Sequence, residues 1–224
     1  MSDSEFPAGA AASARTAPAN PPLRLAPRSQ AGRGAPTTPR LVTLVGIAAI
    51  TAAVSLVASP GLPGVLGAIL ALLMLAIAAI DMRHFVIPDE LSAAAFGLAF
   101  VASWADDRAA PLRVFLDAAA MAVVRAAALA LVFLLLRELF RRLRGRRGLG
   151  LGDVKLGCVA GAWLDWNTIP VCVEIAALGA LAFHVVRQLR RGRDLRATAR
   201  LPFGPFLAPA IWLCWLLQAV WVGA

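Results

Sequence analysis

Long apolar runs separated by short polar stretches make up the chain from residue 41 onward. A helix needs about 20 apolar residues to cross the hydrocarbon core of a bilayer. Seven runs have this character, at approximately 41–58, 61–80, 91–105, 112–136, 153–165, 168–186 and 204–223. The third and fifth are shorter and need neighbouring polar turns, tilt or local thinning to complete a crossing. The pattern predicts an all-α fold, a polytopic membrane helix bundle with about seven transmembrane helices over residues 41–224.

Residues 1–40 have a different character. They are rich in Ala, Pro, Ser and Arg and show little hydrophobic periodicity. Such a segment cannot bury enough apolar surface to offset its chain entropy, so we predict a disordered cytoplasmic tail. A polar stretch of this length before the first apolar run is unlike a cleavable signal peptide, whereas 41–58 is also compatible with a long uncleaved signal anchor.

Composition supports a membrane environment. The 224 residues are 60% hydrophobic and 16% charged, with a mean hydropathy of +0.75, which leaves too few charges to cover a soluble globule. The net charge of +9 would by itself suggest a nucleic-acid partner. However, the arginines gather in short stretches between apolar runs, as in the cytoplasmic loops of membrane proteins. We therefore expect membrane lipid as a partner and no nucleic acid.

The basic stretches also predict an orientation. Arginines crowd the tail and the segments 137–147 and 187–200, whereas the turns at 59–63 and 166–168 have no Lys or Arg. With seven helices all the basic stretches fall on one side, which the positive-inside rule assigns to the cytoplasm.

Two aspartates at helix ends are the candidates for chemistry. Asp81 ends the second predicted helix and Asp153 begins the fifth, so both lie at the predicted cytoplasmic face. Two carboxylates that approach closely in a low dielectric have separated pKa values, and the pair titrates as a unit. The ionised member then activates water while the protonated member polarises a peptide carbonyl. On the local motif alone, a simple helix cap at Asp153 is an equally good interpretation.

The residues around the two aspartates suit helix starts and close backbone contact. Pro88 is suited to the start of the third helix and Asp89 to its N-cap. Gly150 and Gly152 allow a bend or close approach before Asp153. We interpret these residues as support for the site or for a substrate groove.

We expect structural or groove-lining roles for four further residues near the predicted cytoplasmic face. Lys155 lies two positions after Asp153, so on a helix it points largely away from it, and we expect a structural or lipid-headgroup contact. The turn before the last helix is expected to shape the start of that helix and to border the groove, and it consists of Phe203, Gly204 and Pro205.

The remaining polar residues predict neither a metal nor a cofactor. The chain has three cysteines and no CxxC pair, and His84, His184 and Glu174 lack metal-ligand spacing.

Arg125 lies in the middle of the fourth predicted helix, where a charge is costly and should face the bundle interior. We expect a structural ion pair with Asp117 or Glu174. Alternatively, Asp117 pairs with Arg113 on the outer face of the helix. Asp117, Arg125 and Glu174 also define the alternative function of an ion-coupled transporter. A non-catalytic membrane scaffold of a secretion system is a further alternative.

Three sequence blocks resemble the prepilin peptidase (type IV leader peptidase) family of GxGD-type membrane aspartic proteases. They are D-x5-I-P-D at 81–89, G-x-G-D-V-K-L at 150–156 and L-P-F-G-P-F at 201–206, and the likeness covers roughly residues 65–215. It implies that Asp81 and Asp153 are the catalytic pair. It also implies cleavage of the basic leader of type IV pilin-like precursors at the cytoplasmic face of the bacterial inner membrane.

One departure from the family pattern bears on a second activity. The resemblance implies that bifunctional members carry a cytoplasmic domain with paired CxxC motifs between their first helices and also methylate the new amino terminus. Here only a few residues separate the first two predicted helices. We therefore expect the compact form, a peptidase without methyltransferase activity that resembles the enzymes of Flp-type pilins. The sequence makes no prediction of oligomeric state.

Overall fold

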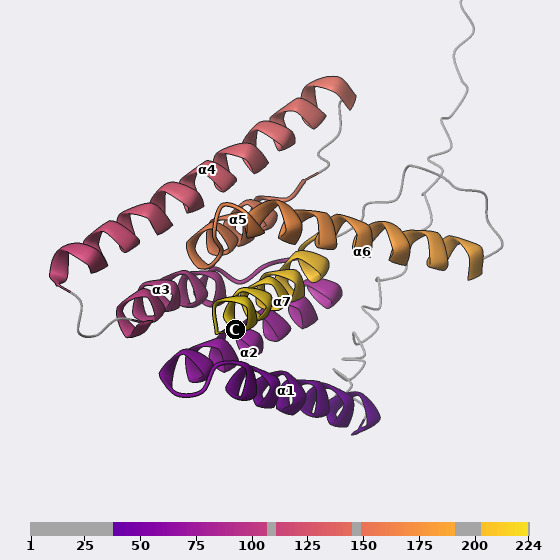
Figure 1. The fold of residues 1–224 in the computed structure, drawn as a ribbon. Helices are drawn as coiled ribbons and strands as arrows, with labels where there is room; N and C mark the ends of the chain where they lie inside the picture. The colour runs from indigo at the N-terminus through magenta and orange to yellow at the C-terminus, as the bar shows by residue number, and fades with distance from the viewer. Residues whose placement is uncertain (1–37, 107–110, 145–148, 191–202, 224) are drawn as a thin grey trace, which may run out of the picture. The chain divides into compact units, whose positions relative to one another are not determined.

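The computed structural model describes residues 38–106, 111–144, 149–190 and 203–223. These residues form seven helices and no strand, which confirms the predicted all-α helix bundle (Figure 1). The helices are α1 (Thr38–Ala58), α2 (Leu62–His84), α3 (Asp89–Asp106), α4 (Leu112–Arg144), α5 (Leu151–Trp163), α6 (Thr168–Arg190) and α7 (Gly204–Gly223). The predicted tail lies outside the described residues, except for 38–40, which begin α1.

Helix α2 continues one turn beyond its predicted end at residue 80. It stops where Phe85 adopts the left-handed conformation (φ 54°) and donates its N–H to the Asp81 carbonyl at 2.9 Å, a common way to end a helix. Asp81 therefore lies inside the last turn of α2 and is held by regular helical backbone.

Helix α4 also runs further than its apolar pattern, to Arg144 instead of residue 136. Within this extension, Glu138 accepts hydrogen bonds from Arg141 at 2.7 Å and Arg142 at 2.8 Å. Pairs spaced three and four residues apart support the helix here. Four apolar residues also continue at helical spacing, namely Leu136, Leu139, Phe140 and Leu143. A boundary drawn where the uninterrupted apolar run stops therefore came too early.

Four helices are long and apolar enough to cross a membrane: Leu62–His84, Leu112–Leu143, Thr168–Arg190 and Gly204–Trp221. They make this a multi-pass membrane protein. Helix α5 has only 13 residues and is about 20 Å long, whereas the hydrocarbon core is about 30 Å thick. By itself α5 is therefore too short to cross the core.

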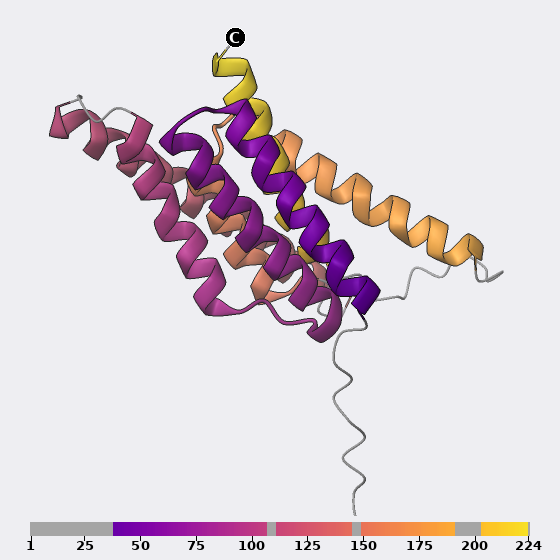
Figure 2. The same cartoon turned by 90° about the horizontal axis from the view of Figure 1, so that it is seen from below.

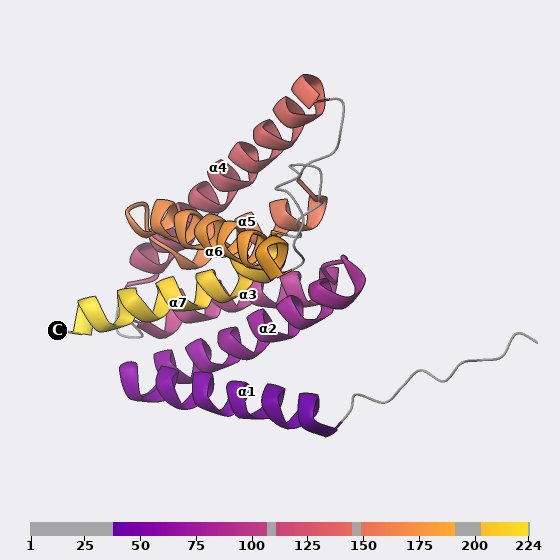
Figure 3. The ribbon, with the colours of Figure 1, turned by 90° about the vertical axis from the view of Figure 1, so that its right-hand side faces the viewer.

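Helices α2, α5 and α7 lie in the interior of the helix bundle. Helix α1 packs on α2, α4 packs on α5, and α6 packs on α7 (Figures 1 and 3). The C-terminal half of α6 extends beyond the helices on which it packs (Figures 1 and 2). The largest buried side chains come mainly from the interior helices, and they include Leu70, Met74, Ile77, Leu156, Leu207 and Ile211.

Candidate active site

The structure brings Asp81 and Asp153 to the same place. Their side chains come from the last turn of α2 and the first turn of α5, and both residues are buried, with 6% and 7% of their surface exposed. Gly204, the first residue of α7, adjoins both: its N–H donates to the Asp153 carboxylate, and a Cβ atom there would collide with the Asp81 carboxylate. Three helix ends thus converge on two carboxylates.

Asp153 also caps its own helix. Its Oδ2 accepts the Gly150 N–H at 3.0 Å, with Gly150 at the N-cap and Asp153 at the third helical position. A bond from the N-cap N–H to the side chain at the third helical position is one of the two bonds of a capping box. The two interpretations of Asp153, a helix cap and a member of a carboxylate pair, are therefore compatible, because one carboxylate does both.

Burial sets the electrostatics of Asp153, which lies outside the four candidate membrane spans. Loss of solvation raises the pKa of Asp153 to about 6, and the negative charge of Asp81 adds to this shift, while the Gly150 and Gly204 N–H groups oppose it. A carboxyl group of this kind retains part of its proton close to neutral pH. The pair can therefore hold one proton between two acids.

Ile87 fits between the glycines of the site. It is buried, with 7% of its surface exposed. A Cβ atom added at Gly152 would lie 2.8 Å from the Ile87 Cδ1 atom, and a Cβ atom added at Gly204 would lie 3.0 Å from it. Sequence reasoning did not single out Ile87. The available signal was its place before Pro88 in the block D-x5-I-P-D.

An ion pair links α5, which carries Asp153, to the start of α3. The Lys155 Nζ donates to the Asp89 carboxylate and joins the first turn of α5 to the start of α3. Asp89 is the first residue of α3 instead of its N-cap. The preceding Pro88 carbonyl accepts the backbone N–H of Ser92 at 3.2 Å and its hydroxyl at 3.1 Å. An acid in the first turn still complements the helix dipole.

The turn before α7 directs the chain toward the two carboxylates. The Phe203 carbonyl accepts the N–H groups of Phe206 and Leu207, both at 3.0 Å, and so starts the helix. The Phe203 ring packs edge-on against Phe133 of α4 at a centroid distance of 6.2 Å. Pro205 is buried in the first turn of α7, a position where the missing N–H costs little.

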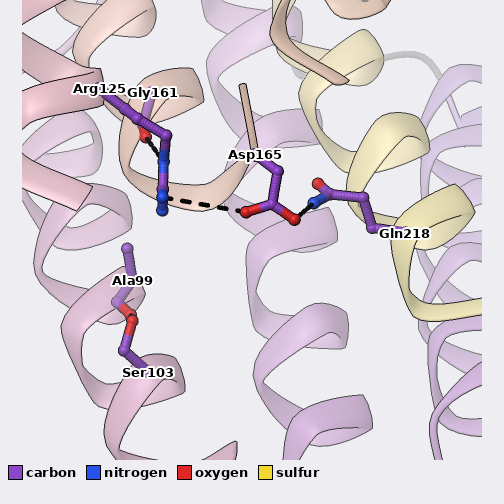
Figure 4. A network of polar contacts seen from close by, with 6 residues as sticks. All are labelled: Ala99, Ser103, Arg125, Gly161, Asp165 and Gln218. Atoms are coloured by element: carbon purple, nitrogen blue, oxygen red, sulfur yellow. Dashed lines mark hydrogen bonds and ion pairs between the residues drawn. The ribbon is translucent and has the colours of Figure 1, made fainter. Parts of the chain in front are cut away.

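The predicted partners of Arg125 were wrong. Asp117 and Glu174 are exposed. Arg125 instead donates to the Gly161 carbonyl at 3.2 Å and lies 3.9 Å from the Asp165 carboxylate (Figure 4). Asp165 follows the short helix α5 in a turn, within reach of the middle of α4. Because these charges do not line one buried path, they give no support to an ion-coupled transporter.

In the part of the chain that the structure describes, no group of three or more His, Cys, Asp or Glu residues is placed to hold a metal ion. His84 is exposed at the end of α2. The three cysteines are free thiols.

Comparison with known proteins decides the family. A model of the type IV leader peptidase family matches residues 68–185, more than half of the chain. The chain belongs to this family. The matched range includes both aspartates, whereas the third sequence block at 201–206 lies beyond it.

Relatives within the type IV leader peptidase family are bifunctional enzymes and leader peptidases by name. The prepilin leader peptidase/N-methyltransferase of Xanthomonas campestris pv. campestris is 35% identical over 137 residues, which are 61% of this chain and 44% of that protein. The protein of the same name from Burkholderia pseudomallei (strain 1026b) is 50% identical over 70 residues, 31% of this chain and 22% of that protein. Leader peptidase HopD of Escherichia coli is 46% identical over 71 residues, 32% and 45% of the two chains.

The chain thus spans less than half the length of each of these relatives. No solved structure matches it. Family membership confirms the resemblance seen in the sequence, and it makes this chain a member of a peptidase family.

We expect Gly204→Ala to destabilise this family member. The added methyl group enters space held by the Asp81 carboxylate and Ile87, and overpacking of this kind costs about 1–3 kcal/mol. Thermal unfolding of the purified protein in detergent measures the effect. Gly97→Ala in α3 is the matched control, because no atom lies within 4 Å of its added Cβ. Equal midpoints for the two variants would contradict the close contact at Gly204.

We expect Asp153→Asn to raise the thermal midpoint, and to do so most above pH 7. The folded-state pKa of about 6 exceeds the usual value of 3.8. Asp153 therefore weakens the fold as pH rises through this window, and the penalty is complete above it. Asparagine carries no charge and keeps an oxygen that can accept the Gly150 N–H.

Unfolding midpoints between pH 4 and pH 8 test this expectation. The gain should shrink toward pH 4, where Asp153 is protonated in the folded state as well. Glu90→Gln, at an exposed position in the first turn of α3, is the control and should show no such rise. A gain from Asp153→Asn that does not depend on pH would show that burial of its charge is not the cause.

Proposed function

We propose that this protein is a membrane aspartic endopeptidase that cleaves the leader of type IV pilin-like precursors, with Asp81 and Asp153 as its catalytic pair. The observation that carries the proposal is the convergence of two buried carboxylates from distant parts of the chain on Gly204. A purely structural role would not favour two like charges in one buried place, because each raises the cost of ionising the other.

The pair can hydrolyse a peptide bond without a cofactor. The ionised carboxylate takes a proton from water, and the oxygen of that water attacks the scissile carbonyl carbon. The protonated carboxyl donates its proton to the carbonyl oxygen. The leaving amine then takes a proton from the acid that gained one, and the C–N bond breaks. A hydroxyl of the tetrahedral intermediate returns its proton to the other carboxylate, so the pair again holds one proton. Because the proton belongs to the pair, we assign neither role to one aspartate alone.

The substrate follows from the family. The relatives are named as leader peptidases of prepilins, and that activity is what the present site can perform. A prepilin-like precursor is therefore the protein partner that we propose. Within this class, the Flp-type pilins are the proposed subset, because the connection between α1 and α2 is short, as expected for the compact form.

We also propose that cleavage occurs at the cytoplasmic face of the bacterial inner membrane. The last turn of α2, which contains Asp81, also contains the basic residue Arg83. Helices α4 and α6 end in basic residues, among them Arg142 and Arg190. In a bundle of alternating helices these ends share a side with the start of α5 and α7, and basic ends favour the cytoplasm.

A methyltransferase activity is not part of the proposal. Helices α1 and α2 are joined by residues 59–61 alone, which cannot contain a folded domain. The sequence has no CxxC pair. We therefore propose cleavage alone as the activity of this domain.

We expect Asp81→Asn and Asp153→Asn each to reduce leader cleavage by ~100-fold or more, the usual scale for loss of an acid or base. The assay incubates purified protein in detergent with a precursor pilin peptide and labelled S-adenosylmethionine, and analyses the products by mass. Asp89→Asn is the matched control and should retain measurable activity, since Asp89 pairs with Lys155 at an exposed position.

This assay tests the catalytic pair and the absence of methylation separately. Full processing by either asparagine variant would remove that aspartate from the catalytic pair. Label on the new amino terminus would instead show that the protein also methylates its product. The expected product is short and unmethylated, and its yield should be bell-shaped against pH because activity needs one proton on the pair.

The proposed orientation predicts opposite labelling of the two ends of α5. In a variant without its native cysteines, Trp166→Cys in the exposed α5–α6 turn should react with an impermeant maleimide in intact spheroplasts. Arg146→Cys, between α4 and α5, should react only after the membrane is opened. Labelling of Arg146→Cys in sealed spheroplasts would place the active site on the outer side.

A further inference from the structure

Helix α5 carries Asp153 at one end and meets an intramembrane arginine at the other. The last four carbonyl groups of a helix have no partner within it, and in α5 Gly161 provides the first of them, since Leu164 N–H bonds to Ala160. Arg125 lies inside the α4 membrane span, and its Nε donates to the Gly161 carbonyl at 3.2 Å (Figure 4). A cation at this end also complements the helix dipole.

The same guanidinium belongs to a polar chain across three segments (Figure 4). Its Nη1 lies 3.9 Å from Asp165 Oδ1, and the other oxygen of Asp165 accepts the Gln218 side-chain N–H at 2.6 Å. The chain therefore runs from α4 through the α5–α6 turn to α7. The Arg125 side chain is only 15% exposed, and a charge so placed is retained where it has partners.

Close packing fixes this end of α5 further. A Cβ at Gly161 would lie 2.5 Å from the Arg125 carbonyl oxygen and 2.6 Å from the Ala126 backbone, so the backbones of α4 and α5 touch here. On another side, Trp163 Nε1 donates to the Ala95 carbonyl of α3 at 2.8 Å. Three neighbouring helices therefore hold the end of α5 that is remote from Asp153.

We propose that Arg125 is a positioning residue, whose cap on α5 keeps Asp153 in register with Asp81. Eight residues of helix separate Asp153 from Gly161, about 12 Å. A helix this short moves as one body, so a shift or tilt at Gly161 displaces Asp153 as well. The Gly150 N–H and Ile87 hold the first turn locally, and the cap at Gly161 fixes the opposite end of the same short helix. The kinetic part of this inference rests on the proposed function, whereas the geometric part does not.

The geometric test measures the proximity of the two site positions without any peptidase activity. Cysteines replace Asp81 and Asp153 in a chain whose native cysteines are changed to alanine, and a protease site is placed in the 145–148 connection. A short bifunctional thiosulfonate reagent then joins the two thiols, and non-reducing gels after proteolysis show how fast the halves become linked. We expect Arg125→Met to slow this linkage several-fold.

Matched variants separate positioning from general damage. Arg113→Met removes an exposed arginine from the first turn of the same helix and should leave the linkage rate unchanged. Arg125→Lys keeps the charge and should recover part of the rate. Gln218→Leu removes only the outer hydrogen bond of the chain, and it should give a smaller decrease that remains measurable if Arg125→Met yields little folded protein.

The kinetic test uses the chain with both aspartates in place. We expect Arg125→Met to lower kcat for leader cleavage and to leave KM nearly unchanged, because the displaced group is Asp153 and not a substrate contact. A linkage rate equal to that of the parent in both Arg125→Met and Gln218→Leu would overturn the positioning role, even if their thermal midpoints fall. Slower linkage in Arg125→Met, combined with no leader cleavage by the parent protein that keeps both aspartates, would uphold the positioning role and refute the proposed function instead.

Discussion

The site depends on keeping two carboxylates together in a place that excludes most water. Their mutual repulsion is strong in a low dielectric, so the surrounding backbone must hold them where electrostatics would separate them. Gly204 permits the approach because it has no side chain, and its N–H offers Asp153 a hydrogen bond. Ile87 fills the space beside it. The glycines and the isoleucine of the three sequence blocks therefore act as one packing unit.

This constraint explains why α5 can be short. A helix that spans the bilayer is positioned by its apolar faces along its whole length, and α5 is likewise largely buried from Val154 to Trp163, with polar contacts added at both of its ends. At its start, Asp153 supplies both the cap and the charge. At its end, Arg125 and Trp163 make polar contacts with the rest of the bundle. Backbone groups at membrane depth require such partners, and here they also orient a side chain at the opposite end.

Apolar runs predicted all seven helices because lipid tolerates little else in a membrane, and the motifs placed Asp81 and Asp153 at the same depth. The extension of α4 was missed because Glu138 and its arginines interrupt the apolar run, although their ion pairs stabilise the helix. The partner of Arg125 was missed because Asp165 becomes its neighbour only when α5 ends early. Sequence alone does not give the tilt or vertical offset of one helix against another, and Ile87 was missed for the same reason.

Stability and chemistry make opposite demands on Asp153. Its burial raises the cost of the ionised form that a general base needs, so the site weakens the fold that contains it. The exposed Lys155–Asp89 pair contributes little against that cost, since surface ion pairs are weak. Buried contacts therefore have to offset most of that cost, and they run along the whole of α5, from Val154 to Trp163. The site proposed at the start of this short helix thus depends on packing along its full length, including the contacts of Arg125 at the far end.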